Sequence, residues 1–140
     1  MNDRRPSPID LVIDTSAIMA IALDEAPAND VRSVLVASRG PVVSAATLVE
    51  LTIVATARFG VGGPPAVRVV LDRADVVTIP VDEHQAELAL GAWQRFGKGR
   101  HPAGLNYGDC FTYALAKHLE VPLLCVGDHF AQTDVELARS

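Results

Sequence analysis

Short apolar runs alternate with longer amphipathic stretches along this chain. The first predicted strand, at 9–13, centres on Leu11-Val12-Ile13 and stops at Asp14. A short, mainly β-branched run of this kind is typical of a strand that is covered on both faces of a parallel sheet. Good helix formers follow at once, at 15–23. A strand that ends in Asp and turns directly into a helix places the carboxylate at the carboxyl edge of the sheet, where open α/β folds bind their ligands.

The same alternation continues toward the C-terminus. In the helix predicted at 82–96, the spacing of apolar residues places Ala86, Leu90 and Trp93 on the inward face. Residues 133–138 fit either a short edge strand or a helical turn. The remaining pattern predicts strands at 42–44, 76–79 and 123–126, and helices at 25–38, 45–59, 66–73 and 107–119.

Strands that alternate with helices predict the α/β class. The expected architecture is a parallel sheet of four to five strands, joined by right-handed crossovers, with helices on both faces. The chain has 140 residues, which suits one domain with a single well-buried core. We therefore expect a single domain over 1–140 that begins with a flexible polar tail at 1–8.

The charge of the chain at first argues against a nucleic-acid partner. Twelve basic and 17 acidic residues give a net charge of −5, whereas nucleic-acid binders are usually basic. This argument fails if the acids are gathered where a cation binds. Hydrophobic residues make up 49% of the chain, a surplus that suggests a buried partner surface.

The sequence contains no evident targeting or membrane-spanning segment. The apolar stretch near the N-terminus is interrupted by Asp10 and Asp14, so it does not fit a secretory signal. No apolar run approaches the roughly 20 residues that cross a bilayer. We expect a cytoplasmic protein without membrane contact, in which Cys110 and Cys125 are reduced core thiols.

Acidic residues fall near the ends of several predicted strands. Carboxylates gathered at one sheet edge repel one another unless a cation binds among them. A helix N-terminus relieves this repulsion by only about 0.3–1 kcal/mol per group. The acids follow the first strand, lie in the helix after the second, open the helix before the fourth and follow the fourth; they are Asp14, Glu50, Asp109 and Asp128.

Each of these acids also has an ordinary structural explanation. A lone Asp after a strand, such as Asp14, most often caps the next helix. Asp128 has the position of a turn aspartate. Taken singly, these explanations are at least as good as a catalytic role, but together they leave the gathering of acids unexplained. Capping-box spacings join Thr47 to Glu50 and Asn106 to Asp109.

Four motifs carry these acids. They are Ile13-Asp14-Thr15-Ser16-Ala17, Thr47-Leu-Val-Glu50, Leu105-Asn-Tyr-Gly-Asp109-Cys-Phe-Thr-Tyr-Ala114, and Leu123-Leu-Cys-Val-Gly-Asp128-His-Phe130 with Thr133-Asp134. In this order they resemble the acidic motifs of the PIN-domain ribonucleases, and most closely those of the VapC toxins of bacterial toxin–antitoxin pairs. The resemblance covers nearly the whole chain, from about residue 9 to residue 137.

The resemblance implies a PIN-like three-layer fold with a parallel sheet in the order 3-2-1-4-5. Strands one and four would then be neighbours whose chains wind off in opposite directions, so Asp14 and Asp128 would face the ligand crevice. It also implies an endoribonuclease toxin whose products carry a 5′-phosphate and a 3′-hydroxyl. Many relatives have a second acid just before the Phe, where this chain has His129. Asp128 is therefore the first choice for the fourth acid, and Asp134 the second.

The residue types indicate which cofactor such a site would take. Oxygen ligands from Asp and Glu suit Mg²⁺ or Mn²⁺ rather than zinc. One or two such ions can lower the pKa of a bound water and neutralise a scissile phosphate during in-line displacement. This chemistry, with the resemblance, assigns catalytic metal binding to Asp14, Glu50, Asp109 and Asp128, and supporting roles to Thr15, Ser16 and Asp134.

Basic residues gather in the loop at 97–106. Lys98, Arg100 and His101 lie near its tip, and we expect them to contact the RNA backbone, because local positive charge can hold phosphates on an acidic protein. A merely solvated loop is an equally good interpretation. His118 falls on an apolar helix face, so we expect it in the core.

Three other functional classes compete with this interpretation. A metal-independent ribonuclease could use His101 or His129 as its acid and base, and its activity would resist EDTA. A phosphoacceptor receiver domain would need two adjacent acids after the first strand and a late lysine, and the chain has neither. A non-catalytic binding module would leave the gathered acids without a role.

The first helix predicts a partner. Residues 17–23 are apolar on nearly every face, and such a helix must be buried all round. The sheet covers one side and the helix at 25–38 another, which leaves an apolar strip of the kind that marks interfaces. By resemblance two partners compete for this strip, a second copy of the chain and a VapB-like antitoxin, and we expect a homodimer that also binds the antitoxin. In the monomeric alternative, the helix at 82–96 covers the strip.

Overall fold

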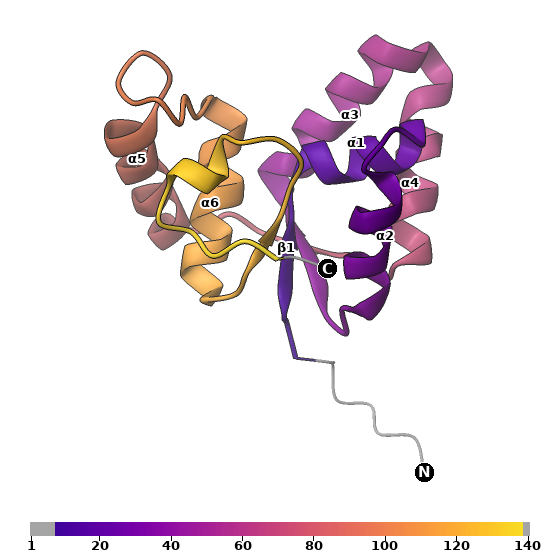
Figure 1. The fold of residues 1–140 in the computed structure, drawn as a ribbon, viewed down its shortest axis with the longest axis horizontal. Helices are drawn as coiled ribbons and strands as arrows, with labels where there is room; N and C mark the ends of the chain where they lie inside the picture. The colour runs from indigo at the N-terminus through magenta and orange to yellow at the C-terminus, as the bar shows by residue number, and fades with distance from the viewer. Residues whose placement is uncertain (1–7, 139–140) are drawn as a thin grey trace.

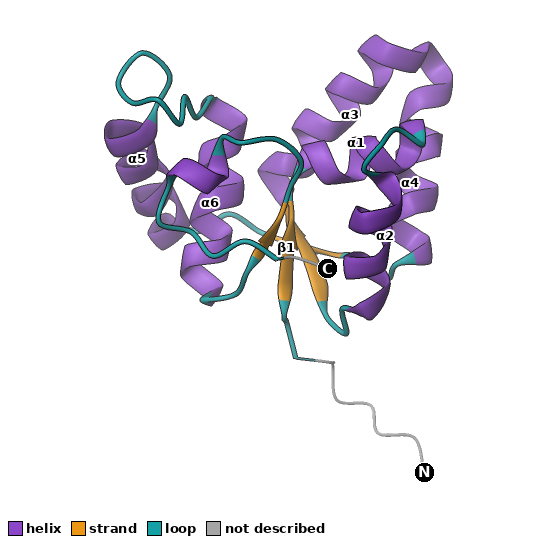
Figure 2. Cartoon of the chain, in the orientation of Figure 1, coloured by secondary structure: helices purple, strands orange, loops and turns teal. Residues whose placement is uncertain are grey.

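The structure, a computed structural model, describes residues 8–138, in which helices surround a central parallel sheet (Figures 1 and 2). The flexible tail predicted at 1–8 therefore lies, except for its last residue, outside the described residues. The elements are β1 (Leu11–Ile13), α1 (Thr15–Leu23), α2 (Ala28–Ala37), β2 (Pro41–Ser44), α3 (Ala45–Phe59), η1 (Gly60–Gly62), α4 (Gly63–Arg73), β3 (Val77–Ile79), α5 (Glu83–Phe96), α6 (Tyr107–Leu119), β4 (Leu123–Leu124) and η2 (Phe130–Gln132).

The sheet has the strand order β3-β2-β1-β4, and its strands are parallel. Val12 of β1 is aligned with Val42 on one side and with Leu123 on the other. The strand that ends in Asp14 is therefore the switch point from which the chain winds off in two directions. The predicted α/β class and the order of its first four strands are confirmed.

The predicted fifth strand is reduced to a single parallel bridge between Leu123 and Leu137. The Leu123 amide donates to the carbonyl of Glu136 at 2.9 Å, and the Ala138 amide donates to the carbonyl of Leu123 at 2.9 Å. β4 is also shorter than predicted. The chain leaves the sheet after Leu124, because the Val126 amide donates instead to Ser16 Oγ at 2.9 Å.

The helices cover both faces of the sheet, as predicted (Figure 2). Leu11 and Ile13 pack into an apolar cluster with α1, α2, α3 and α4. Val12, between them, points to the other face and packs with α5 and α6. Since α5 lies on the face opposite α1, the monomeric alternative in which the helix at 82–96 covers the apolar strip of the first helix is wrong.

The inward face predicted for α5 is wrong. Leu90 and Trp93 are 55% and 41% exposed. Ala89 and Ala92 pack instead into the core cluster that α5 shares with α6, while Leu90 and Trp93 line a groove between the two helices. His118 was also expected in the core, but it is only half-buried, with its Nδ1 2.7 Å from Nδ1 of His84. The buried positions of α5 are Gln85, Ala89, Ala92 and Phe96.

One helical stretch, at 45–73, is long and apolar enough to cross a membrane when judged by length and composition alone. In the fold this stretch is interrupted at Gly60, whose φ of +66° ends α3. The chain then turns through η1 into α4, which packs with α1 against the same core cluster. The stretch is therefore two helices of the α/β domain, and its hydropathy is weak evidence for a membrane segment.

Candidate active site

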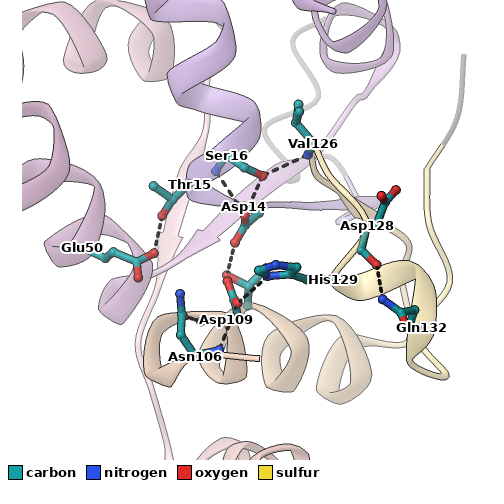
Figure 3. A network of polar contacts seen from close by, with 11 residues as sticks. Asp14, Thr15, Ser16, Glu50, Asn106, Asp109, Val126, Asp128, His129 and Gln132 are labelled. Atoms are coloured by element: carbon teal, nitrogen blue, oxygen red, sulfur yellow. Dashed lines mark hydrogen bonds and ion pairs between the residues drawn. The ribbon is translucent and has the colours of Figure 1, made fainter. Parts of the chain in front are cut away.

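Asp14 lies at the end of β1 and is 4% exposed. Its Oδ2 accepts hydrogen bonds from the Ser16 amide at 3.1 Å and from Ser16 Oγ at 2.7 Å, so it caps α1 as a lone Asp was expected to do (Figure 3). Its Oδ1 accepts from Thr112 Oγ1 of α6 at 2.9 Å. Thr112 has one hydroxyl proton and gives it to Asp14, so Thr47 of α3 donates in turn to Thr112 across 3.0 Å. Three helices thereby fix one carboxylate.

Glu50 reaches the same region from the second turn of α3. Its Oε1 accepts from Thr15 Oγ1 at 2.7 Å (Figure 3). The capping box expected between Thr47 and Glu50 is not formed, because Ser44 Oγ caps α3 by accepting from the Ala46 amide at 3.2 Å. The carboxylate of Glu50 is therefore directed away from its own helix end, toward the carboxyl edge of the sheet.

Gly108 explains how α6 comes so close to Glu50. A Cβ atom at this position would lie 1.7 Å from Oε2 of Glu50, so a larger residue would have to displace the carboxylate of Glu50 from its present position. Sequence reasoning placed Gly108 inside a motif but assigned no role to it. The glycine lets the first turn of α6, which carries Asp109, pack directly against the second carboxylate.

Asp109 opens α6 and takes part in the predicted capping box. The Asn106 amide donates to Asp109 Oδ2 at 3.1 Å, and the Asp109 amide donates to Asn106 Oδ1 at 2.9 Å. The same Oδ2 lies 3.5 Å from Nδ1 of His129, which points toward it (Figure 3). The cap and the shared site are thus compatible: helix capping holds the carboxylate in place beside its neighbours.

These side chains line one open pocket of about 390 Å³ at the carboxyl end of the sheet. The pocket lies between the two helical layers, with α1 and α3 on one side and α6 and the segment after β4 on the other. This is the switch-point crevice where open α/β sheets bind ligands. Its lining includes Asp14, Thr15, Ser16, Glu50, Arg58, Asn106, Asp109, Gly127, Asp128 and His129.

Burial and neighbouring negative charge raise the pKa of two carboxylates in the pocket, Glu50 and Asp109. Burial is the largest cause that raises the pKa of Glu50, and the charges of Asp14 and Asp109 raise it further against the opposing hydrogen bond from Thr15. Burial also raises the pKa of Asp109, as does the charge of Asp14, while the Asn106 amide and His129 lower it. The charged form of this cluster is therefore unfavourable without a compensating cation.

The donor set fits a hard divalent cation. The oxygens are those that Mg²⁺ and Mn²⁺ prefer, and Mg²⁺ commonly keeps several waters while it takes only one or two protein carboxylates. Over residues 8–138, no group of three or more His, Cys, Asp or Glu side chains is arranged so that it could hold a metal ion by itself. An ion here would accordingly be held by few direct ligands, with Asp14, Glu50 and Asp109 as the candidates.

The structure separates the two candidates for the fourth acid. Asp128 lines the pocket, but its side chain is exposed and points away from Asp14 (Figure 3). Asp134 does not line the pocket. Its carboxylate accepts a hydrogen bond from the Tyr113 hydroxyl and pairs with Lys117 Nζ at 3.3 Å. Of the two, Asp128 is the one that lines the pocket, although its carboxylate is turned away from Asp14.

The basic loop residues lie outside the acidic pocket. Arg100 stacks over the Trp93 ring, with its guanidinium carbon 4.1 Å from the ring centroid. Lys98 lines the apolar groove between α5 and α6. His101 Nδ1 accepts a hydrogen bond from the Ala103 amide at 3.0 Å, which gives this ring a structural role in the loop. His129 is the histidine that reaches the acids.

Known proteins carry the same sequence pattern over most of this chain. The PIN domain model matches residues 11–136. The chain is 46% identical over 125 residues to ribonuclease VapC of Mycolicibacterium smegmatis, which covers 89% of this chain and 97% of that protein. It is 43% identical over 125 residues to ribonuclease VapC30 of Mycobacterium tuberculosis, which covers 89% of this chain and 95% of that protein.

Solved structures share the fold at lower sequence identity. VapC20 of Mycobacterium tuberculosis, described as a sarcin–ricin loop cleaving toxin, matches with a TM-score of 0.75 and 16% identity over 94% of this chain and all (100%) of that chain. VapBC-5 of the same organism, a member of the VapBC family of toxin–antitoxin systems, matches with a TM-score of 0.67 and 22% identity over 95% of this chain and 100% of that chain. The chain belongs to the PIN-domain family and, within it, to the VapC ribonucleases of toxin–antitoxin systems.

Proposed function

We propose that this protein is a cytoplasmic endoribonuclease that depends on Mg²⁺ or Mn²⁺ and acts as the toxin of a toxin–antitoxin pair. The observation that carries the proposal is the meeting of Asp14, Glu50 and Asp109 in one pocket, where each is held in place by a hydroxyl or amide donor. Cleavage of RNA by the purified chain, lost in excess EDTA and restored by Mg²⁺ or Mn²⁺, tests it. Cleavage that resists EDTA would favour a metal-independent mechanism with His129.

The residues of the pocket divide the work of such a reaction. A bound divalent cation would lower the pKa of a water molecule and neutralise charge on the scissile phosphate. Asp14, Asp109 and Glu50 would hold that cation. Thr112 and Thr15 keep the carboxylates in one orientation through their hydroxyl donors. The expected products carry a 5′-phosphate and a 3′-hydroxyl.

The apolar strip of the first helix supports a separate antitoxin partner. A groove of about 710 Å³ runs between α1, α2 and α4, and Val36 on its wall is 77% exposed. A groove of this kind accepts the apolar face of an amphipathic segment. We propose that a VapB-like antitoxin places its C-terminal segment here and directs a basic side chain toward the acids. Loss of cleavage on addition of the neighbouring gene product would support this partner.

The two helical layers also carry surfaces that suit a homodimer. Val49 and Ile53 form an exposed ridge on α3, at 60% and 64% exposure. Leu90 and Trp93 line the groove between α5 and α6. In a twofold dimer, the ridge of each copy can meet the groove of the other, since such an interface is reciprocal. Light scattering that gives a monodisperse monomer would contradict the dimer, and an Ile53→Asp variant would dissociate it if the ridge is the contact.

We also propose that the basic loop contacts RNA. Lys98 and Arg100 are exposed, and Lys98 lines a groove together with Asn106 and Tyr107 at the start of α6. Replacing both by Ala should weaken RNA binding and flatten its salt dependence, while metal affinity stays near wild type. If the salt dependence of RNA binding does not change in this double variant, the loop is merely solvated and does not contact RNA. His101 completes this proposed set, although its Nδ1 is engaged within the loop.

A further inference from the structure

Arg58 of α3 lines the acidic pocket although sequence reasoning gave it no role. Its neighbours in the lining include the carboxylates of Asp14, Glu50, Asp109 and Asp128. Among the residues that line this pocket, Arg58 is the one lysine or arginine. An RNA strand brings negative charge to a site that is already strongly negative. Arg58 is therefore the lining residue best suited to bind a phosphate of the RNA.

The position of Arg58 follows from the geometry of α3. Glu50, Val54 and Arg58 are spaced by four residues, so they lie on one face of the helix, and all three line the pocket. Glu50 and Arg58 are separated by about 12 Å along the helix axis at 1.5 Å per residue. In Figure 1, α3 rises from the carboxyl end of the sheet toward the rim of the molecule. A strand that lies along this face would pass from the acids to the guanidinium.

The present partner of Arg58 resembles a phosphate in charge. Its Nη2 lies 3.7 Å from Oε1 of Glu25, which belongs to the turn between α1 and α2. Both side chains are more than half exposed, at 55% and 58%, and exposed ion pairs of this kind are weak. A guanidinium can bind two phosphate oxygens at once. Exchange of the Glu25 carboxylate for a phosphate therefore requires no rearrangement of the core.

We propose that Arg58 is a positioning residue that binds a backbone phosphate of the RNA, away from the scissile one, and so aligns the strand along α3. This inference rests on the proposed ribonuclease function. Glu25 then acts as a competitor that holds the guanidinium in the free protein and releases it to the substrate.

The test is binding of a fluorescein-labelled, mixed-sequence single-stranded RNA oligonucleotide, followed by anisotropy in EDTA at several salt concentrations. Arg58→Ala should weaken binding by about tenfold, the loss expected for one charge-assisted contact. It should also reduce the slope of log affinity against log salt by about 0.7, the value for one phosphate on a single strand. Arg58→Lys should recover part of the affinity and the full slope.

A matched control is available on α4. Arg68 has the same side-chain exposure of 55% and a similar exposed ion pair, with Asp72 at 3.8 Å, but it does not line the acidic pocket. Arg68→Ala should leave both the affinity and the slope as in the wild type. Glu25→Gln should strengthen RNA binding, whereas Arg58→Ala weakens it, because Glu25→Gln removes the competitor and leaves the guanidinium free. If the Arg58–Glu25 ion pair were merely structural, Arg58→Ala and Glu25→Gln would bind the RNA with the same affinity.

The binding assay separates this inference from the proposed function, because it needs no cleavage. Wild-type affinity and slope in Arg58→Ala would overturn the role of Arg58 even if the enzyme cleaves RNA. The same result together with weakened binding to the neighbouring gene product would assign Arg58 to the protein partner instead. If the chain cleaves RNA, Arg58→Ala should raise KM more than it lowers kcat, and a loss confined to kcat would equally contradict a positioning role.

Discussion

Acidic residues at two places in this protein have pKa values that are shifted in opposite directions. In the pocket at the end of the sheet, burial and the neighbouring carboxylates raise the pKa of Glu50 and Asp109. At the back of α6, burial raises the pKa of Asp134, but the Tyr113 hydroxyl and the charges of Lys117 and Arg95 outweigh it and lower that pKa overall. In the pocket the raising effects outweigh the hydrogen bonds and His129, whereas at Asp134 the cations built into the fold outweigh burial.

This difference separates an acid whose charge is paired within the fold from the acids for which we propose a catalytic role. Asp134 attaches the segment after β4 to α6 and α5, through ion pairs of 3.3 Å with Lys117 and 3.6 Å with Arg95. Its charge is satisfied within the chain. The pocket carboxylates receive hydroxyl and amide donors, which fix their orientation without neutralising their charge. The divalent cation proposed above would supply positive charge at these carboxylates.

The largest expected effect is on the pocket. Asp14→Asn should reduce RNA cleavage by more than about a hundredfold, because even the outer partners of metal ligands contribute about 10–100-fold. Asn keeps the shape and can still cap α1, so the fold should persist. The control is Asp72→Asn, an exposed acid on α4 that pairs with Arg68. Equal cleavage by the wild type and Asp14→Asn, measured by fragment yield, would remove Asp14 from the reaction.

Thr112→Val tests whether a hydroxyl orients Asp14. The threonine is fully buried and donates to Asp14 Oδ1. The isosteric change leaves that oxygen and the Thr47 hydroxyl without their partner, which costs about 1–3 kcal/mol of stability. Cleavage should fall by about tenfold or more through the misplaced carboxylate. Thr52→Val, at an exposed site on α3 whose hydroxyl donates to the Leu48 carbonyl, is the control. Stability and cleavage that both match this control would refute the orienting role.

Glu50→Gln should stabilise the metal-free protein. The pKa of Glu50 is raised in the folded protein. Its contribution to the free energy of unfolding is therefore fully present below the usual value of 4.5 and is lost as the pH rises through the folded-state pKa. The amide removes that loss and still accepts from Thr15. In EDTA near neutral pH, the melting temperature should rise by a few degrees, equivalent to about 1 kcal/mol or less after solvent screening. The further rise on addition of Mn²⁺ should shrink. A lower melting temperature in the variant would show that the carboxylates do not repel one another.

The smallest change in stability is expected at Asp134. Substitution there should destabilise the protein, whereas Glu50→Gln should stabilise it. Asp134→Asn removes a carboxylate with a lowered pKa, so its stabilising contribution is present above about 3.8 and is lost as the pH falls through the folded pKa. The side chain is 41% exposed, so the cost should be below about 1 kcal/mol. Mn²⁺ should stabilise this variant as much as the wild type. A Mn²⁺ response lost in Asp134→Asn would return that residue to the metal site.

Most of the fold could be predicted because hydrophobic periodicity dominates it. Leu11, Val12 and Ile13 are buried on both faces, as a short β-branched run indicates. The amphipathic face of α5 could not be assigned by size, because the helix has apolar residues on two sides. Small Ala89 and Ala92 are buried in the cluster with α6, whereas large Leu90 and Trp93 are exposed along the groove. Which of the two apolar sides of α5 faces the core depends on how closely the helix packs against α6, and that distance cannot be read from the sequence.

The site was predictable at strand ends and less so elsewhere. Asp14 and Asp109 are tied to a strand end and a helix start, so spacing alone placed them correctly. Glu50 resembled a capping residue, and only the cap by Ser44 frees it. Thr112 and Gly108 act through contacts with segments far away in the sequence, namely Asp14 and Glu50. Loop residues after β4 could not be oriented in advance, which is why Asp128 and Asp134 could not be separated.

The central claim is that the acidic pocket cleaves RNA with the help of a divalent cation. The most direct test treats the purified wild-type chain with EDTA, titrates Mg²⁺ or Mn²⁺ back and maps the ends of the RNA fragments. The account predicts no cleavage in EDTA, recovery with added metal, and fragments with 5′-phosphate and 3′-hydroxyl ends. Cleavage that persists in excess EDTA, or fragments with 5′-hydroxyl ends, would contradict it.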